Sequence, residues 1–119
     1  MTLTRGIPLT MHGAIEVLAA PAIMAAPFVL GFGAAATAIA IGLGLVLMTM
    51  ALQLEGPRRT IPLSAHAEFD YALAIFAVSA GLAIAIATGA WAESAFLVGV
   101  GIAQVALTAS TRFSVARGA

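Results

Sequence analysis

The chain contains no cysteine and no lysine, and only 8% of its 119 residues are charged. The absence of cysteine excludes disulfide bonds, thiolate metal sites and cysteine nucleophiles. A soluble domain carries roughly 25% charged residues, whereas 62% of this chain is apolar. A chain of this length is too short to bury that much apolar surface in the core of a soluble protein. We therefore expect its apolar surface to face lipid. The net charge of +0 gives no basic surface for nucleic acid, and no nucleic-acid partner is expected.

Uncharged runs predict where the chain crosses the membrane. Residues 17–54 contain no ionisable side chain, and as one helix they would span about 57 Å against a hydrocarbon core of roughly 30 Å. The glycines within 31–33 favour a turn, so this run predicts helices over about 11–30 and 34–54. The second half predicts helices over about 65–88 and 94–112, with a turn at 89–93. We therefore expect an all-α integral membrane protein, a bundle of four transmembrane helices in two tandem hairpins.

A short polar segment, here called the head, begins each half of the chain. Residues 5–16 and 59–70 align at a constant offset of 54, with five identities in twelve positions. The identical pairs are Arg5/Arg59, Ile7/Ile61, Pro8/Pro62, Leu9/Leu63 and His12/His66. The apolar residues behind each head have diverged. The sequence thus predicts a tandem duplication within one membrane domain, with repeats over about 5–54 and 59–112.

Each head places a histidine and an acid at positions i and i+4, on one face of a helix. The proline, with Thr10 or Ser64 two positions later as N-cap, predicts the start of that helix. Both heads begin on the same side of the membrane, so we expect a pseudo-twofold axis along the membrane normal. The two faces would then meet near this axis, with roughly 3–6 Å between partners of different repeats. The candidate binding residues are His12, Glu16, His66 and Asp70.

Three interpretations of the heads stay open. The acid can stabilise its own histidine and the positive end of the helix. Imidazole and carboxylate also suit a divalent metal or a haem-type site. Ionisable groups inside a membrane helix can, finally, serve a proton or ion relay. No nucleophile–base pair, phosphate loop or nucleotide fingerprint is present, so no catalytic residue and no cofactor is predicted, and metal binding is undecided. We expect a non-enzymatic structural, interaction or accessory protein, or alternatively one that handles a small ligand, metal or ion.

Glycine pairs recur in the second helix of each half. I-G-L-G-L at 41–45 aligns with V-G-V-G-I at 98–102 at an offset of 57, which predicts a second hairpin loop three residues longer than the first. Small residues let helix backbones approach closely in lipid. Gln104 has no polar counterpart and is expected to form a hydrogen bond between helices. The residues predicted to lie at helix contacts are Gly42, Gly44, Gly99 and Gly101.

The positions of the five arginines predict the orientation of the helices in the membrane. Arg5 precedes the first helix, Arg58 and Arg59 lie between the second and third, and Arg112 and Arg117 follow the fourth. With four spans these segments share one side, and the positive-inside rule predicts that both termini of this multi-pass protein are cytoplasmic. The expected partners are the lipid bilayer and, further, a second copy or another membrane protein.

Two stretches of the first repeat resemble a known family. I-P-L-T-M-H-G-A-I-E at 7–16, followed by A-P-F-V-L-G-F at 26–32, resembles the small prokaryotic membrane proteins built on the SPW repeat. In that family, two-helix units carry a Ser-Pro-Trp motif near the end of their first helix, often in a duplicated four-helix chain. Residues 26–28 (A-P-F) stand at that motif, and residues 80–82 (A-G-L) show that the second copy lacks it. The resemblance implies the architecture and a bacterial inner membrane, but no catalytic residues.

Overall fold

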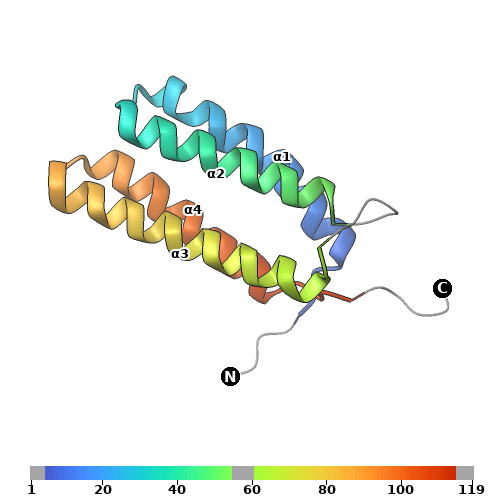
Figure 1. Cartoon of the computed structure of the whole chain (residues 1–119). Helices are drawn as coiled ribbons and strands as arrows, with labels where there is room; N and C mark the ends of the chain where they lie inside the picture. The colour runs from blue at the N-terminus through green and yellow to red at the C-terminus, as the bar shows by residue number, and fades with distance from the viewer. Residues whose placement is uncertain (1–4, 55–60, 115–119) are drawn as a thin grey trace.

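The computed structural model describes residues 5–54 and 61–114. Its four helices are α1 (Leu9–Leu30), α2 (Ala34–Leu52), α3 (Leu63–Thr88) and α4 (Trp91–Ala109). All four are long and apolar enough to cross a membrane. They form two hairpins, α1–α2 and α3–α4, whose helices run roughly side by side (Figure 1). The predicted all-helical architecture of four helices, each able to span a membrane, is confirmed.

The first helix of each repeat begins directly after a proline. The carbonyl groups of Pro8 and Pro62 accept the first helical hydrogen bonds from the amides of His12 (3.0 Å) and His66 (2.9 Å). Neither start has a side-chain cap. The prediction of a hydroxyl N-cap is therefore wrong, because each helix starts two residues earlier and its hydroxyl residue lies inside the first turn. Proline fixes the extended backbone at the cap without help from that hydroxyl.

Glycine ends both of these helices. Gly31 and Gly89 adopt left-handed conformations, with φ of 70° and 69°, which a residue without a Cβ reaches at little cost. The turn at 31–33 is as predicted. The second turn is only 89–90, because α4 already begins at Trp91. The prediction of a longer second loop is wrong: α3 has 26 residues against 22 in α1, so the extra length lies in the helix.

The two hairpins share one close approach, at a glycine in the second helix of each repeat, and the second hairpin has a further one at Gly81. A Cβ added to Gly44 would lie 2.9 Å from the carbonyl oxygen of Ala20, and one added to Gly101 would lie 2.7 Å from that of Ala74. These are equivalent positions of the two repeats. The helix-contact prediction is confirmed for this pair of glycines, because any larger side chain would separate the backbones.

For the other two glycines the helix-contact prediction is wrong. A Cβ added to Gly42 or Gly99 would meet nothing within 4 Å, and both residues are exposed. Two positions along a helix turn a residue about 200° around the axis. In each G-x-G pair, only the second glycine can therefore face the partner helix of its own hairpin.

The apolar core cluster and the buried histidines and acids occupy different ends of the bundle. The apolar cluster is formed by Ala36, Leu43, Ala77, Ile84 and Leu97, toward the end that carries the two hairpin turns. Near those turns the amide of Gly33 donates to Glu93 Oε1 at 2.7 Å and links the hairpins. The buried histidines and acids lie at the opposite end, where the helices of both heads begin.

Candidate functional site

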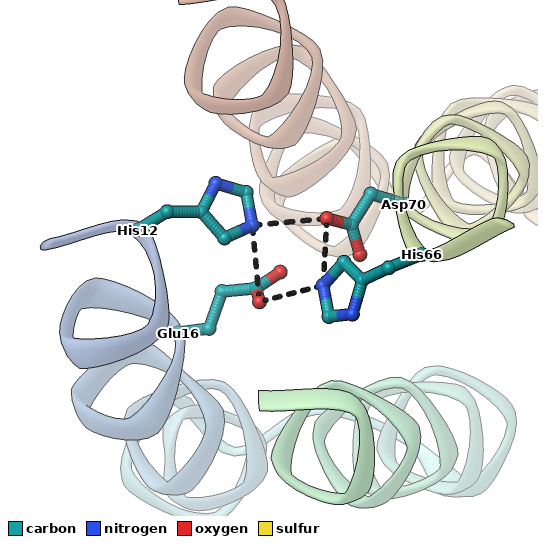
Figure 2. Close-up of side chains that lie close together, drawn as sticks. All are labelled: His12, Glu16, His66 and Asp70. Atoms are coloured by element: carbon teal, nitrogen blue, oxygen red, sulfur yellow. Dashed lines mark hydrogen bonds and ion pairs between the residues drawn. The ribbon is translucent and has the colours of Figure 1, made fainter. Parts of the chain in front are cut away.

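The two heads converge in the interior. His12 and Glu16 extend from α1, His66 and Asp70 extend from α3, and the four side chains point at one another (Figure 2). None is more than 2% exposed. One ligand atom of each residue lies within 4.8 Å of those of the other three. The predicted convergence of the heads is confirmed, and we call these four residues the cluster.

Nitrogen and oxygen alternate around the cluster. Within each repeat, histidine Nε2 lies 3.1 Å (His12–Glu16 Oε1) or 3.2 Å (His66–Asp70 Oδ2) from the acid one turn later. Between repeats, His12 Nε2 lies 2.9 Å from Asp70 Oδ2, and His66 Nε2 lies 3.5 Å from Glu16 Oε1. Each Nε2 therefore faces two carboxylate oxygens, one from either repeat. The i, i+4 spacing and the pseudo-twofold relation of α1 and α3 produce this arrangement.

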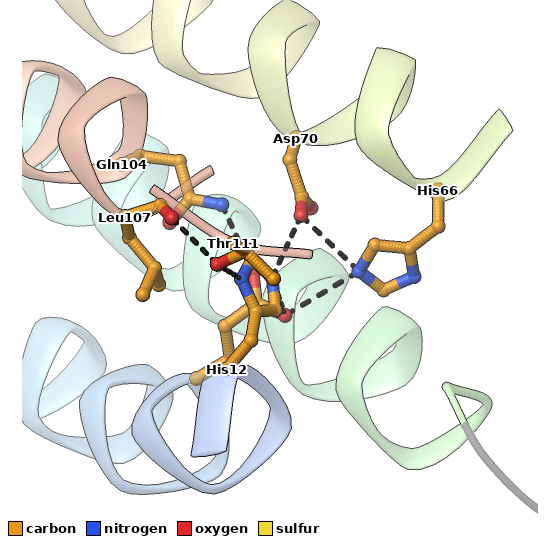
Figure 3. Close-up of polar contacts among 7 residues, drawn as sticks. His12, His66, Asp70, Gln104, Leu107 and Thr111 are labelled. Atoms are coloured by element: carbon orange, nitrogen blue, oxygen red, sulfur yellow. Dashed lines mark hydrogen bonds and ion pairs between the residues drawn. The ribbon is translucent and has the colours of Figure 1, made fainter. Parts of the chain in front are cut away.

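Helix α4 and the residues after it form hydrogen bonds with His12 and Glu16, the two cluster residues of the first repeat. The Thr111 hydroxyl donates to the carbonyl oxygen of Leu107 at 2.6 Å, and its oxygen lies 2.8 Å from His12 Nδ1. The Gln104 amide donates to Glu16 Oε2 at 2.9 Å. Figure 3 shows these contacts reaching the cluster from α4. Hydrogen bonds of this kind, made by groups behind a ligand, orient imidazole and carboxylate in metal sites.

The Thr111 contact determines which nitrogen of His12 carries a proton. The hydroxyl hydrogen is used on Leu107, so the oxygen must accept from His12, and Nδ1 carries hydrogen. A neutral His12 then has a lone pair on Nε2, directed at oxygens of Glu16 and Asp70. Three electron-rich atoms at such distances repel unless a positive charge lies among them. The site thus requires either a further proton, on the imidazole or on a carboxyl group, or a cation.

Two atoms of this ring have no hydrogen bond. Glu16 Oε1 and His66 Nε2 are fully buried and make none with the described residues. Their mutual distance of 3.5 Å exceeds the usual range for an N–H···O bond. Buried polar groups are normally paired. Both orphaned atoms belong to the ring drawn in Figure 2, whose other members are His12 Nε2 and Asp70 Oδ2.

An extended segment after α4 covers the cluster. Ile7 pairs with it through two backbone hydrogen bonds, from its amide to Ser110 (3.0 Å) and from the Arg112 amide to its carbonyl (2.9 Å). The Phe113 ring then packs against both histidine rings, with centroids 5.0 and 5.9 Å apart. We call residues 110–113 the cover. It joins the start of α1 to the end of the chain's last helix.

Sequence reasoning found the four cluster residues and the interhelical hydrogen bond of Gln104, which is confirmed. It missed Thr111 and its contact with His12. The available signal was a run of polar residues at 104, 108 and 111, spaced by four and three residues along the end of α4 and just beyond it. The equivalent positions of the first repeat, 47, 51 and 54, hold only leucine and alanine. Both repeats thus contribute a histidine and an acid to the cluster, whereas only the second repeat contributes polar side chains that form hydrogen bonds with it.

No family model matches the sequence, and no curated protein or solved structure is significantly similar to it. The resemblance to SPW-repeat proteins stays a prediction. Three of the five arginines behind the predicted orientation, Arg58, Arg59 and Arg117, lie outside the described residues.

Proposed function

We propose that this protein binds one divalent transition-metal ion between its two repeats. The supporting observation is the pair of buried ring atoms without hydrogen bonds, Glu16 Oε1 and His66 Nε2. An ion inside the ring would bind both, together with His12 Nε2 and Asp70 Oδ2. Two imidazoles and two carboxylates are a ligand set that zinc, iron, manganese and cobalt accept.

The spacing of the ligand atoms fits such an ion. Zinc binds nitrogen and oxygen at about 2.0–2.2 Å in a tetrahedron, which places neighbouring ligand atoms about 3.4 Å apart. The four nitrogen–oxygen distances in the ring are 2.9, 3.1, 3.2 and 3.5 Å. The four ligand atoms lie within 4.8 Å of one another, so the pairs across the ring must move together by up to about 1.4 Å before all six separations match a tetrahedron.

Charge supports the same proposal. Two buried carboxylates without a counter-charge would be very costly in a low-dielectric interior. A divalent ion with two neutral histidines makes the cluster neutral. The ion would also connect α1 with α3, which belong to different hairpins. We therefore propose a structural or accessory role in the membrane and not an enzymatic one.

A second candidate is a site that holds two protons instead of a metal. Protonating both histidines also neutralises the carboxylates, and the 2.9 Å contact of His12 with Asp70 suits a charged hydrogen bond. This alternative corresponds to ion or proton handling. It also makes ion pairs of the contacts between His12 and Glu16 (3.1 Å) and between His66 and Asp70 (3.2 Å), although Glu16 Oε1 and His66 Nε2 form no well-aligned hydrogen bond.

The metal content of the purified protein tests the proposal. The protein is isolated with an affinity tag free of histidine, and divalent metals are quantified by mass spectrometry. We expect about one ion per chain, and a loss of it in Asp70→Asn. Glu68→Gln is the matched control, because Glu68 is an exposed acid on the same helix, two residues away. Metal-free wild-type protein, or equal metal content in both variants, would contradict metal binding.

We further propose that the four helices cross the cell inner membrane with both termini in the cytoplasm. The segregation of the arginines supports this orientation, and the cluster would then lie toward the cytoplasmic side. Reporter fusions at Gly33 and Gly118 test it. Activity of a periplasm-only reporter at Gly118 would refute the orientation. The same reporter should be active at Gly33.

A further inference from the structure

Two grooves run between the hairpins, one on either side. The α1–α4 groove has a volume of about 500 Å³, and the α2–α3 groove one of about 360 Å³. Both are mainly apolar. They occupy equivalent places in the two repeats: Gly99 lies in the first and its counterpart Gly42 in the second. The small residues Ala95, Gly99 and Ala103 form one wall of the α1–α4 groove.

Only the α1–α4 groove leads to buried polar groups. Glu16 and Gln104 line it, whereas neither Asp70 nor a polar counterpart of Gln104 lines the other groove. Leu47 stands at the position equivalent to Gln104. The two grooves therefore occupy equivalent places but differ in chemistry, which makes the second an internal control for the first.

The polar end of the α1–α4 groove offers a hydrogen-bond acceptor. The Gln104 amide nitrogen donates to Glu16 Oε2, because the opposite orientation would place two oxygens together. The carbonyl oxygen of the Gln104 side chain receives no hydrogen bond from the described residues, and it is not among their fully buried unpaired atoms, so it stays accessible. An acceptor without a donor is costly away from water, and a ligand in the groove that Gln104 lines can supply the donor.

We propose that the α1–α4 groove binds a membrane-soluble molecule with an apolar chain and a neutral hydroxyl head. The hydroxyl donates to the Gln104 carbonyl oxygen, and the chain lies along Gly99 and Ala95. From Gln104 to Ala95 the groove follows α4 for about 13 Å. Its volume falls within the 300–1,000 Å³ typical of small-molecule sites.

The depth of the polar end selects this ligand over ordinary phospholipid. Glu16 lies seven residues after the start of α1, about 10 Å along the helix. A charged phosphate head would have to leave the interface to reach it, whereas a hydroxyl is small and neutral. A positively charged head is not required, because the cluster is neutral with either a divalent ion or two protons. The inference depends on the Glu16–Gln104 hydrogen bond and not on the bound metal.

Photolabelling in phosphatidylcholine nanodiscs tests the proposal. The probe is hexadecanol with a diazirine in mid-chain, and its methyl ether, which cannot donate a hydrogen bond, is the matched probe. Labelled residues are mapped by mass spectrometry. We expect the alcohol to label 95–103 of α4 about fivefold to tenfold more than the ether does, as one buried hydrogen bond implies. Labelling of 38–46 in α2 should not distinguish the probes.

Three variants complete the experiment. Gly99→Leu should abolish the selective labelling, and Gly42→Leu, its counterpart in the other groove, should leave it unchanged. Gln104→Leu should make the alcohol and the ether equivalent. Equal labelling of both grooves by both probes, or selective labelling that survives Gly99→Leu, would overturn the proposal and mean solvation by bulk lipid. Metal content measured on the same samples separates this result from a failure of metal binding.

Discussion

Replacing Gly101 by alanine tests how the helices of a repeat approach each other. The added Cβ would lie 2.7 Å from the Ala74 carbonyl oxygen, and ordinary contact begins at 3.4 Å, so α3 and α4 must separate by about 0.7 Å. A backbone carbonyl cannot rotate out of the way. Overpacking of this kind costs about 1–3 kcal/mol, and the better helix propensity of alanine returns up to about 1 kcal/mol. We expect a net loss of about 1–2 kcal/mol in the free energy of unfolding.

The assay is unfolding by SDS titration in mixed micelles, followed by circular dichroism. Gly99→Ala is the control, because the added Cβ meets nothing within 4 Å and only helix propensity changes. That variant should be as stable as wild type or more stable by up to about 1 kcal/mol. If both alanine variants shift stability equally, Gly101 does not lie at a close crossing and the packing account is wrong.

Three further predictions concern the surroundings of the cluster. Thr111→Val removes the acceptor of His12 Nδ1 and should lower metal affinity, measured by competition with a chelator, about 10- to 100-fold. Thr108→Val is the control and should leave the affinity unchanged, because its hydroxyl makes no hydrogen bond; equal affinities of the two variants would contradict the role of Thr111. Phe113→Ala removes the ring that packs against both histidines and should increase the rate at which a chelator removes the metal, measured by stopped flow. Phe28→Ala, at an exposed position in α1, should leave this rate unchanged; an unchanged rate in Phe113→Ala would mean that the ion leaves by another path. Glu93→Ala removes the acceptor of the Gly33 amide and should lower the free energy of unfolding by about 1 kcal/mol, compared with the control Glu68→Ala. Equal free energies of unfolding in the two variants would show that this hydrogen bond does not stabilise the contact between the hairpins.

The sequence predicted the four spans and the cluster for definite physical reasons. Charge is so scarce that uncharged runs could only be spans, and the duplication placed two histidines at equal depth. The grooves could not be predicted, because they depend on the angle at which the hairpins meet. The roles of Gly42 and Gly99 were wrong for the same reason, since a G-x-G pair does not itself show which glycine faces a helix. Thr111 was missed because its contact joins residues 99 positions apart.

Titration of chelator-treated protein with Co²⁺ tests the central claim most directly. Tetrahedral Co²⁺ bound by nitrogen and oxygen absorbs visible light far more strongly than the hydrated ion does. We expect a new absorption band that saturates at one equivalent of Co²⁺ per chain, is absent in Asp70→Asn and persists in Glu68→Gln. A spectrum that remains that of hydrated Co²⁺ throughout the titration would contradict a metal site formed by His12, Glu16, His66 and Asp70.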